Sequence, residues 1–325
     1  MAHFLGFGGY VPEHIMTNDD WSQILDTSDE WITQRTGIKR RRVAADDEST
    51  LTLAADASAL ALKDAGLIPE DIDEIILATD TPEMYTPDTA ALLQDRLGCR
   101  NVPTYDLGGS GCAGFVQALD VARSRIAFEP KKILVVGVEL LTRMVDWKDR
   151  ATAVLFGDGA GAVVLGPDGG RARLLDVVSG TEGGYAGILT LASGGTRNPF
   201  NAKTLESGEY NRVIMDGRRV FTEAVRRMSE AAAEVVERIG RNVSDIAMVI
   251  PHQANIRIID AVRKRLGIDE DRVYVNVHEY GNTGSATVPF AMWEAVRSNR
   301  IKEGDLVVLT AFGAGFHWAA AAVQF

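Results

Sequence analysis

The sequence repeats its own pattern once, and this repeat limits the folds that the chain can adopt. An Asp-Ile segment that leads into an apolar run occurs twice, and each copy later closes on a glycine-rich turn. In order, the paired segments are residues 71–77 with 245–250, 95–98 with 264–267, 133–138 with 306–309, and 156–161 with 312–315. An offset of roughly 170 residues is too long for a solenoid. The repeat therefore predicts two similar halves, residues 1–168 and residues 169–325.

Within each half, apolar runs alternate with segments of helical periodicity. Residues 50–65 carry an apolar stripe, which predicts a helix that ends at Gly66. Residues 75–78 and 133–138 are short, continuous apolar runs, typical of strands that are covered on both faces. The alternation predicts an α/β fold with mixed, largely parallel sheets. Residues 180–212 are rich in Gly, Ser, Asn and Thr, and we expect them to form an exposed linker between the halves.

The charge balance argues against general nucleic-acid binding. The 325 residues include 34 Lys and Arg against 45 Asp and Glu, a net charge of −11. A surface that wraps a duplex usually needs an excess of basic residues. Two cysteines are too few for a disulfide framework. Since the N-terminus also lacks a basic start followed by a long apolar run, we expect a cytoplasmic protein with reduced thiols.

One segment has the length and composition of a membrane span. Residues 306–325 contain no Asp, Glu, Lys or Arg, and as a helix they are long enough to cross a bilayer. However, Gly313 and Gly315 interrupt the segment, and valines cluster near its ends. Two buried strands joined by a glycine turn explain it better, so we expect no membrane association.

A turn of small residues places Cys112 at the start of a helix. Residues 108–111 read Gly-Gly-Ser-Gly, between a strand-like segment and a helical one. Unpaired N–H groups and the helix dipole favour an anion there, so we expect assisted formation of the thiolate. The alternative is a small apolar thiol packed under a turn. We favour that alternative for Cys99, and we favour a nucleophile for Cys112 because the small residues before it leave room for a ligand.

His252 and Asn282 are the partners that the second half offers. His252 follows residues 245–250, where a parallel strand opens into its loop, and such strand ends line ligand crevices in α/β proteins. Asn282 lies in a Gly-Asn-Thr-Gly turn that occupies, under the duplication, roughly the place of the Cys112 turn. Taken alone, His252 could be a structural histidine and Asn282 a turn residue. Their convergence with Cys112 on a pseudo-twofold centre predicts one shared catalytic site.

Several long motifs occur in order along the whole chain. They are Asn18 with residues 27–38, residues 112–115, Asp149 and Arg150 with residues 156–161, and residues 251–255, 281–283 and 312–316. Together they resemble the motifs of the β-ketoacyl-acyl carrier protein synthases III, condensing enzymes of the thiolase superfamily that start fatty-acid synthesis. The resemblance implies a five-layered αβαβα fold and, typically, a homodimer.

The resemblance also implies an acyltransferase that works in two half-reactions. The Cys112 thiolate attacks an acyl-CoA primer, and the N–H groups of Cys112 and Ala314 form the oxyanion hole. Malonyl-acyl carrier protein then loses carbon dioxide and attacks the acyl-enzyme, giving a 3-oxoacyl-acyl carrier protein. His252 and Asn282 donate hydrogen bonds to the malonyl thioester oxygen. CoA and carrier-protein thioesters are substrates, and we expect no metal or redox cofactor, since the histidines and cysteines have no close ligand spacing.

Three residues match the positions that hold the adenine of CoA in the family. Trp31 and Arg35 are four residues apart on an expected helix and share one of its faces. By the resemblance, this pair sandwiches the adenine together with Arg150. Without the resemblance, Trp31 reads as a core aromatic residue. Thr86 falls where acetyl-using members carry a bulky aromatic residue, so we expect it in the acyl channel, with room for longer primers unless Tyr85 fills the space.

Basic residues after His252 form a candidate docking surface for the acidic carrier protein. They are Arg257, Lys264 and Arg265. Arg257 and Lys264 are seven residues apart, so they lie on one face of the expected helix. The alternative is an ordinary solvated helix face. Because this chain is itself acidic, binding the carrier requires such a local basic patch.

Two other functions stay open on the sequence alone. A ketosynthase or acyltransferase of specialised metabolism keeps Cys112 but passes the acyl group to another acceptor. Arg218 and residues 284–285 differ from the common family pattern and leave the primer and the acceptor undetermined. A cysteine hydrolase of thioesters is less favoured, because its triad needs an acid to orient the histidine.

Overall fold

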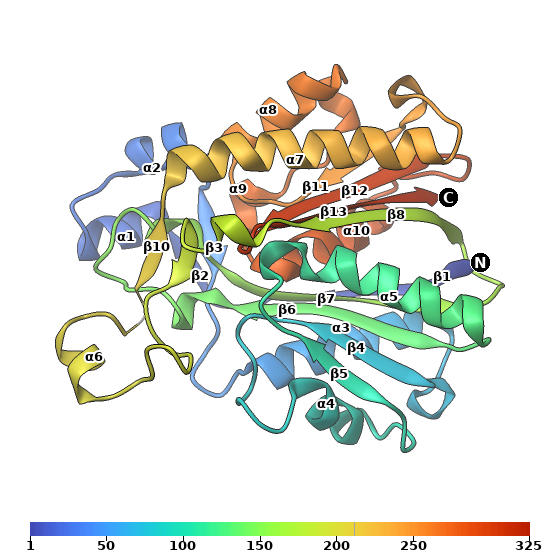
Figure 1. Cartoon of the computed structure of the whole chain (residues 1–325), viewed down its shortest axis with the longest axis horizontal. Coiled ribbons are helices and arrows are strands. Elements are labelled where there is room, and N and C mark those ends of the chain that lie inside the picture. Colours follow the sequence, from blue (N-terminus) through green and yellow to red (C-terminus); the bar gives the residue numbers. More distant parts are fainter. Residues whose placement is uncertain (211) are drawn as a thin grey trace.

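In the computed structural model, which describes residues 1–210 and 212–325, nine strands of both halves join in one continuous sheet (Figure 1). Their order is β11-β12-β13-β8-β1-β7-β6-β4-β5. Along the chain they are β1 (Ala2–Tyr10), β4 (Glu74–Ala78), β5 (Thr104–Leu107), β6 (Ile133–Leu140), β7 (Asp158–Gly166), β8 (Ala172–Thr181), β11 (Met248–Pro251), β12 (Leu306–Gly313) and β13 (His317–Gln324). Two short pairs stand apart: β2 (Ile15–Thr17) with β3 (Arg40–Arg42), and β9 (Leu189–Leu191) with β10 (Val213–Met215).

The helices pack against the sheet and form five layers with it. Along the chain they are α1 (Asn18–Ile24), α2 (Asp29–Thr36), α3 (Thr50–Ala65), α4 (Thr89–Leu97), α5 (Gly114–Phe128), α6 (Ala202–Glu206), α7 (Gly217–Arg238), α8 (Ile256–Leu266), α9 (Val277–Tyr280) and α10 (Thr287–Arg297). The central helices α5 and α10 each contact strands of both halves, and the sheet wraps around them. The pairs α3 with α4 and α7 with α8 form the outer layers (Figure 1). The predicted αβαβα order is confirmed.

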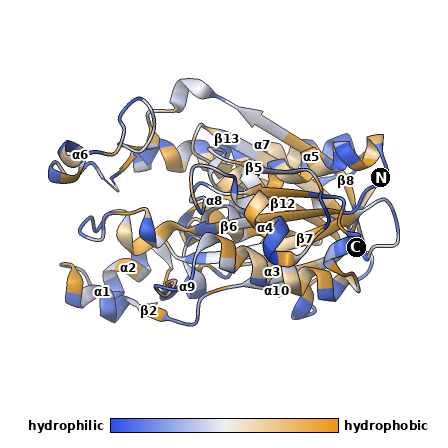
Figure 2. Cartoon of the chain, turned by 90° about the horizontal axis from the view of Figure 1, so that it is seen from below, coloured by the Kyte–Doolittle hydropathy of each residue, from blue (hydrophilic) through white to orange (hydrophobic). Residues whose placement is uncertain are grey.

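The two halves of the sheet meet at one short edge. Strands β1 and β8 pair in antiparallel fashion over three residues, from Ala2 opposite Leu174 to Phe4 opposite Ala172. The predicted division at residues 168 and 169 falls between β7 and β8, and it stays a prediction. Figure 2 shows the central strands as mainly apolar, as strands covered on both faces must be.

The sheet is mixed, but the expectation that it is largely parallel is wrong. Strand β4 pairs in parallel with β5 and β6, and β11 with β12. The pairings β1–β7, β1–β8, β6–β7, β12–β13 and β8–β13 are antiparallel. The reason is that the last strand of each half, β7 or β13, runs opposite to both of its neighbours, and that β1 and β8 are also antiparallel. Residues 306–325 show this best, because they form β12, a glycine turn and β13, as predicted.

Other local predictions have mixed outcomes. The helix over residues 50–65 is α3, and Gly66 ends it in the left-handed conformation with φ 68°. Residues 180–212 are more than a linker, because they include α6 and β9, and β9 pairs with β10 beside the cavity described below. In the described part of the chain, no helix is long and apolar enough to span a membrane.

Candidate active site

A cavity of about 730 Å³ opens where the carboxyl ends of β4, β6 and β11 meet the turn between β12 and β13. Cys112, His252 and Asn282 all line it. Cys112 lies in a 3₁₀ turn, Gly111–Ala113, directly before α5. His252 follows β11, and Asn282 follows α9. The structure therefore brings together the three residues that the sequence predicted to share a site.

The His252 imidazole is buried and fixed from two sides. Its backbone N–H donates to the Thr310 carbonyl oxygen at 2.7 Å, which extends the β11–β12 pairing by one residue. Its Nδ1 atom lies 2.7 Å from the Thr287 hydroxyl oxygen at the start of α10. Burial lowers the pKa of His252 to about 3, so the ring is neutral at physiological pH.

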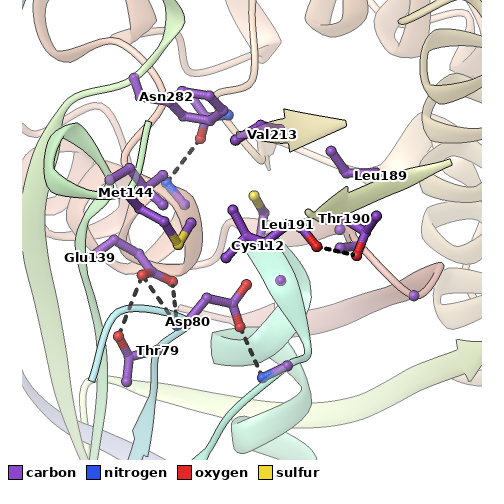
Figure 3. Close-up of a pocket in the computed structure, with 18 of the residues that line it drawn as sticks. Thr79, Asp80, Cys112, Glu139, Met144, Leu189, Thr190, Leu191, Val213 and Asn282 are labelled. Atoms are coloured by element: carbon purple, nitrogen blue, oxygen red, sulfur yellow. Dashed lines mark hydrogen bonds between the residues drawn. The ribbon is translucent and has the colours of Figure 1, made fainter. Parts of the chain in front are cut away.

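Asn282 is held by backbone bonds that cross between the halves. Its N–H donates to the Leu155 carbonyl at 2.9 Å, and its own carbonyl accepts the Gly157 N–H at 3.0 Å. The side-chain oxygen of Asn282 accepts the Gly284 N–H at 2.9 Å (Figure 3). The carboxamide NH₂ is therefore the group that remains for a ligand. An ideal Cβ on Gly157 would lie 2.3 Å from the Tyr280 oxygen, which explains a glycine in the motif 156–161.

The turn before Cys112 packs tightly against the turn between β12 and β13. An ideal Cβ on Gly313 would lie 2.5 Å from the Cys112 nitrogen, and one on Gly111 would lie 2.6 Å from the Ala314 nitrogen. Gly111 also has φ +55°, in the left-handed region. Ala314 has no positive φ, so its Cβ is accommodated without strain. Both backbone nitrogens thus belong to turns in close contact at one wall of the cavity.

Ionisation of Cys112 differs from the expectation. Burial raises the pKa of the Cys112 thiol, and the charges of Asp80 and Glu139 raise it further. Desolvation and the two carboxyl groups therefore act against the assistance to the thiolate that was predicted from the helix start. Cys99 is a buried free thiol, as predicted, and burial raises its pKa as well.

The carboxyl groups of Asp80 and Glu139 were missed by the sequence analysis. Both line the cavity with Cys112, Asp80 two residues after the end of β4 and Glu139 within β6. Their position at the carboxyl ends of parallel strands is the signal that could have found them. No group of His, Cys, Asp and Glu in the described residues is arranged to hold a metal ion.

The remaining walls are apolar. Among the residues that line the cavity are Met84, Leu141, Met144, Leu191 and Val213. Figure 3 shows Met144, Leu191 and Val213 around the space that the Cys112 sulfur faces. Thr86, expected at this wall, is exposed and is not among the residues that line the cavity, whereas its neighbours Met84 and Tyr85 are.

The expected adenine site lies outside the cavity lining. Two guanidinium groups lie over the ring of Trp31 in α2, with the Arg35 carbon Cζ 4.8 Å and the Arg150 carbon Cζ 4.7 Å from the ring centroid. Arg150 also donates to the Asp26 carbonyl oxygen at 2.6 Å. The three residues therefore lie together, and their binding of adenine stays a prediction.

The expected docking residues lie on α8, whose first turn borders the cavity through Ile258. Lys264 pairs with Asp260 at 2.6 Å, and Arg265 pairs with Glu230 at 3.0 Å. Arg257 is exposed and forms no ion pair with the described residues. Arg257 therefore has the charge most available to an acidic partner.

This fold and cavity define an acyl-transferring condensing enzyme of the thiolase type. The family model described as 3-oxoacyl-[acyl-carrier-protein (ACP)] synthase III matches residues 105–183, and the model of its C-terminal part matches residues 236–325. The chain belongs to the 3-oxoacyl-[acyl-carrier-protein] synthase III family.

Similarity extends over the whole chain. The β-ketoacyl-[acyl-carrier-protein] synthase III of Caldanaerobacter subterraneus subsp. tengcongensis is 46% identical, and the match covers 99% of this chain and 97% of the relative. The crystal structure of the synthase III from Aquifex aeolicus VF5 is 41% identical with a TM-score of 0.91, covering 100% of both chains. The Thermus thermophilus structure is 47% identical with a TM-score of 0.91, covering 99% of both chains.

Proposed function

We propose that this enzyme starts fatty-acid synthesis by loading an acyl-CoA primer on Cys112 and condensing it with malonyl-acyl carrier protein. One observation carries the proposal: Cys112, His252 and Asn282 line a single cavity although they come from distant parts of the chain. Family membership supports the same reaction. The product is a 3-oxoacyl-acyl carrier protein.

In the first half-reaction, the Cys112 sulfur attacks the thioester carbonyl of the primer. A bond forms between this sulfur and the carbonyl carbon, the bond from that carbon to the CoA sulfur breaks, and the thiol proton leaves with CoA. The N–H groups of Cys112 and Ala314 stabilise the oxyanion, in keeping with the close contact of their two turns. The apolar walls of the cavity suit the acyl chain.

In the second half-reaction, the bond between the malonyl α-carbon and its carboxylate breaks, and carbon dioxide leaves. The resulting enolate carbon attacks the acyl-enzyme, the carbonyl carbon separates from the Cys112 sulfur, and the released thiolate takes up a proton from solvent. His252 and Asn282 donate hydrogen bonds to the enolate oxygen. A neutral imidazole and a carboxamide can each donate a hydrogen bond while remaining uncharged, which suits a buried site.

The substrates meet the protein at two further places in this proposal. Trp31, Arg35 and Arg150 bind the adenine of CoA. Arg257 is the main docking residue for the carrier protein, and Lys264 and Arg265 contribute to the same surface. Met84 and Tyr85, rather than Thr86, border the acyl chain. The enzyme works on thioesters without a resident metal or redox group, as a homodimer in the cytoplasm.

Mass spectrometry of the intact protein tests the first half-reaction. After exposure to a panel of acyl-CoAs, the wild-type protein and Cys99→Ala should gain the mass of one acyl group, and Cys112→Ala should gain none. An acyl group on Cys112→Ala contradicts the assignment of the nucleophile. The acyl-CoA that reacts fastest identifies the primer.

Isotope release tests the second half-reaction. Asn282→Ala should still become acylated but should release little labelled carbon dioxide from malonyl-carrier protein. Normal release contradicts the role of Asn282. Thioester cleavage without a condensed product, at the rate of acylation, would identify a hydrolase instead.

A further inference from the structure

The half-buried Asp80 and the buried Glu139 form a carboxyl pair that lines the cavity with Cys112, and the proposed reaction does not use it. Glu139 lies on β6, and Asp80 lies just beyond the end of the neighbouring parallel strand β4. The Asp80 N–H donates to both carboxylate oxygens of Glu139, at 3.1 and 3.2 Å. In Figure 3, Asp80 and Glu139 lie to the lower left of the Cys112 sulfur, on one wall of the cavity.

Asp80 holds the turn that leads into Cys112. One of its carboxylate oxygens accepts the Gly109 N–H at 2.9 Å. Both Gly109 and Gly111 have φ in the left-handed region, +75° and +55°, so this turn needs an external partner to fix its N–H groups. The Asp80 side chain therefore binds the backbone of the turn that precedes Cys112.

Glu139 is bonded by neutral groups alone. Its oxygens accept the Thr81 hydroxyl at 2.6 Å and contact the Ser285 hydroxyl oxygen at 2.9 Å. In the described residues, no Arg or Lys forms an ion pair with either carboxyl group. Few titratable groups act on this part of the cavity. The two carboxyls act on each other and on Cys112, and the charge of His317 acts on Asp80. His252 lines the same cavity in its neutral form.

The electrostatics of the pair follow from its surroundings. Burial raises the pKa of the Asp80 carboxyl. Burial, and after it the charge of Asp80, raises the pKa of Glu139 to about 8, so Glu139 keeps its proton at neutral pH. Both carboxyls also raise the pKa of Cys112.

We propose that Asp80 is a positioning residue for Cys112: its carboxylate fixes the turn at residues 109–111 and places a negative charge where the helix start would otherwise favour a thiolate. The resting enzyme accordingly keeps Cys112 as a neutral thiol until a substrate is bound. The inference rests on Cys112 as the nucleophile, but its test measures the thiol without any acyl substrate. Failure of this inference and failure of the proposed function are therefore distinguishable.

The test is the pH profile of Cys112 alkylation by iodoacetamide, followed on its peptide by mass spectrometry so that Cys99 is excluded. Asp80→Asn should lower the midpoint of the profile by about one pH unit. Because a less basic thiolate is also a weaker nucleophile, alkylation at pH 7 should rise only about threefold. Asp106→Asn is the matched control: this carboxyl also lines the cavity and accepts two backbone N–H groups, from Thr89 and Ala90 at 2.8 Å. The control should not move the profile.

An unchanged midpoint in Asp80→Asn overturns the proposal, and a raised midpoint shows that the carboxylate assists loss of the thiol proton instead. If Asp80→Asn does not fold, the pH profile of Cys112 alkylation in the wild-type protein tests the proposal. Its Cys112 midpoint should lie above the ordinary thiol value of about 8.5, and a value at or below it overturns the proposal. Asp80→Ala should also speed amide hydrogen exchange at Gly109, and an unchanged exchange rate contradicts the role in the turn.

Discussion

The Nδ1 atom of His252 lies 2.7 Å from the hydroxyl oxygen of Thr287, the first residue of the central helix α10. Thr287 has one hydroxyl proton, and its oxygen also lies 2.9 Å from the Gly284 carbonyl. A neutral imidazole that donates from Nε2 has no proton on Nδ1. For His252 to donate to a substrate, Thr287 must therefore direct its proton to Nδ1 rather than to Gly284.

Thr287→Val should separate the two half-reactions, because it removes this hydroxyl with little change in side-chain volume. We expect decarboxylation and condensation to fall about tenfold, the equivalent of one buried hydrogen bond, while acylation of Cys112 stays near the wild-type rate. Single-turnover measurements of acylation and of carbon dioxide release check this. Thr287→Ser keeps the hydroxyl and should retain both rates. Equal losses in both half-reactions of Thr287→Val would point to general misfolding.

Gly313→Ala should impair acylation, because the added Cβ would lie 2.5 Å from the Cys112 nitrogen and must push the two turns apart. Removing one oxyanion donor typically costs about 10²-fold in rate, and we expect a loss of this order in the acylation rate. The matched control is Gly184→Ala, since an added Cβ there has no neighbour within 4 Å. A Gly313→Ala enzyme with a normal acylation rate would contradict the proposed oxyanion hole.

The sequence predicted the location of the site better than its electrostatics. Cys112, His252 and Asn282 could be brought together because a duplicated α/β chain places equivalent turns around one centre. Ionisation could not be predicted in this way, since desolvation depends on what packs around the sulfur in three dimensions. Asp80 and Glu139 look like any other acidic residues in the sequence, and only the strand pairing places them beside the thiol.

The fold shows the same division between local and long-range information. The apolar run and Gly66 predicted α3 correctly, because periodicity and a C-terminal glycine are local signals. The direction in which strands pair is set by contacts between distant segments, so largely parallel sheets were expected where antiparallel pairs are frequent. Thr86 shows this within a single loop: the family resemblance placed it at the cavity wall, but its neighbours Met84 and Tyr85 line the cavity instead.

Trp31→Ala should weaken binding of acyl-CoA specifically. The ring of Trp31 is stacked with Arg35 and Arg150, and stacking of a base on an aromatic side chain is worth about 1–3 kcal/mol. We expect KM for acyl-CoA to rise about tenfold or more, with little change in the rate of acylation by an acyl-pantetheine that lacks the adenine. Arg297→Ala removes a comparable guanidinium 4.6 Å from the ring of Trp293, and it should leave both substrates unaffected. Equal effects of Trp31→Ala on both substrates would rule out adenine binding at this position.

Arg257→Glu should reduce the use of malonyl-carrier protein much more than the use of acyl-CoA. Reversing an exposed charge at an electrostatic interface slows association, so the effect should be largest at low salt. We expect kcat/KM for the carrier substrate to fall about tenfold. Lys302→Glu is the control, because Lys302 precedes β12, at the end of that strand away from the cavity. A loss that does not depend on salt, or that is the same for both substrates, would count against docking at α8.

Glu139→Gln should change how the stability of the protein depends on pH. The pKa of Glu139 is raised to about 8 in the folded protein, against 4.5 for an ordinary glutamate. Between these values the folded state binds a proton that the unfolded state has released, so ionisation of Glu139 lowers the free energy of unfolding as pH rises, by at most about 1.4 kcal/mol per pH unit. Glutamine cannot ionise, and the stability of the variant relative to wild type should therefore increase from pH 7 to 9.

Urea unfolding in this range avoids the titration of His252, which contributes below its ordinary pKa of 6.5. The exposed Glu303→Gln is the control and should follow the wild-type curve. If the two curves of wild type and Glu139→Gln stay parallel, the carboxyl pair does not hold a proton at neutral pH, and the charge that we assign to the wall beside Cys112 must be revised.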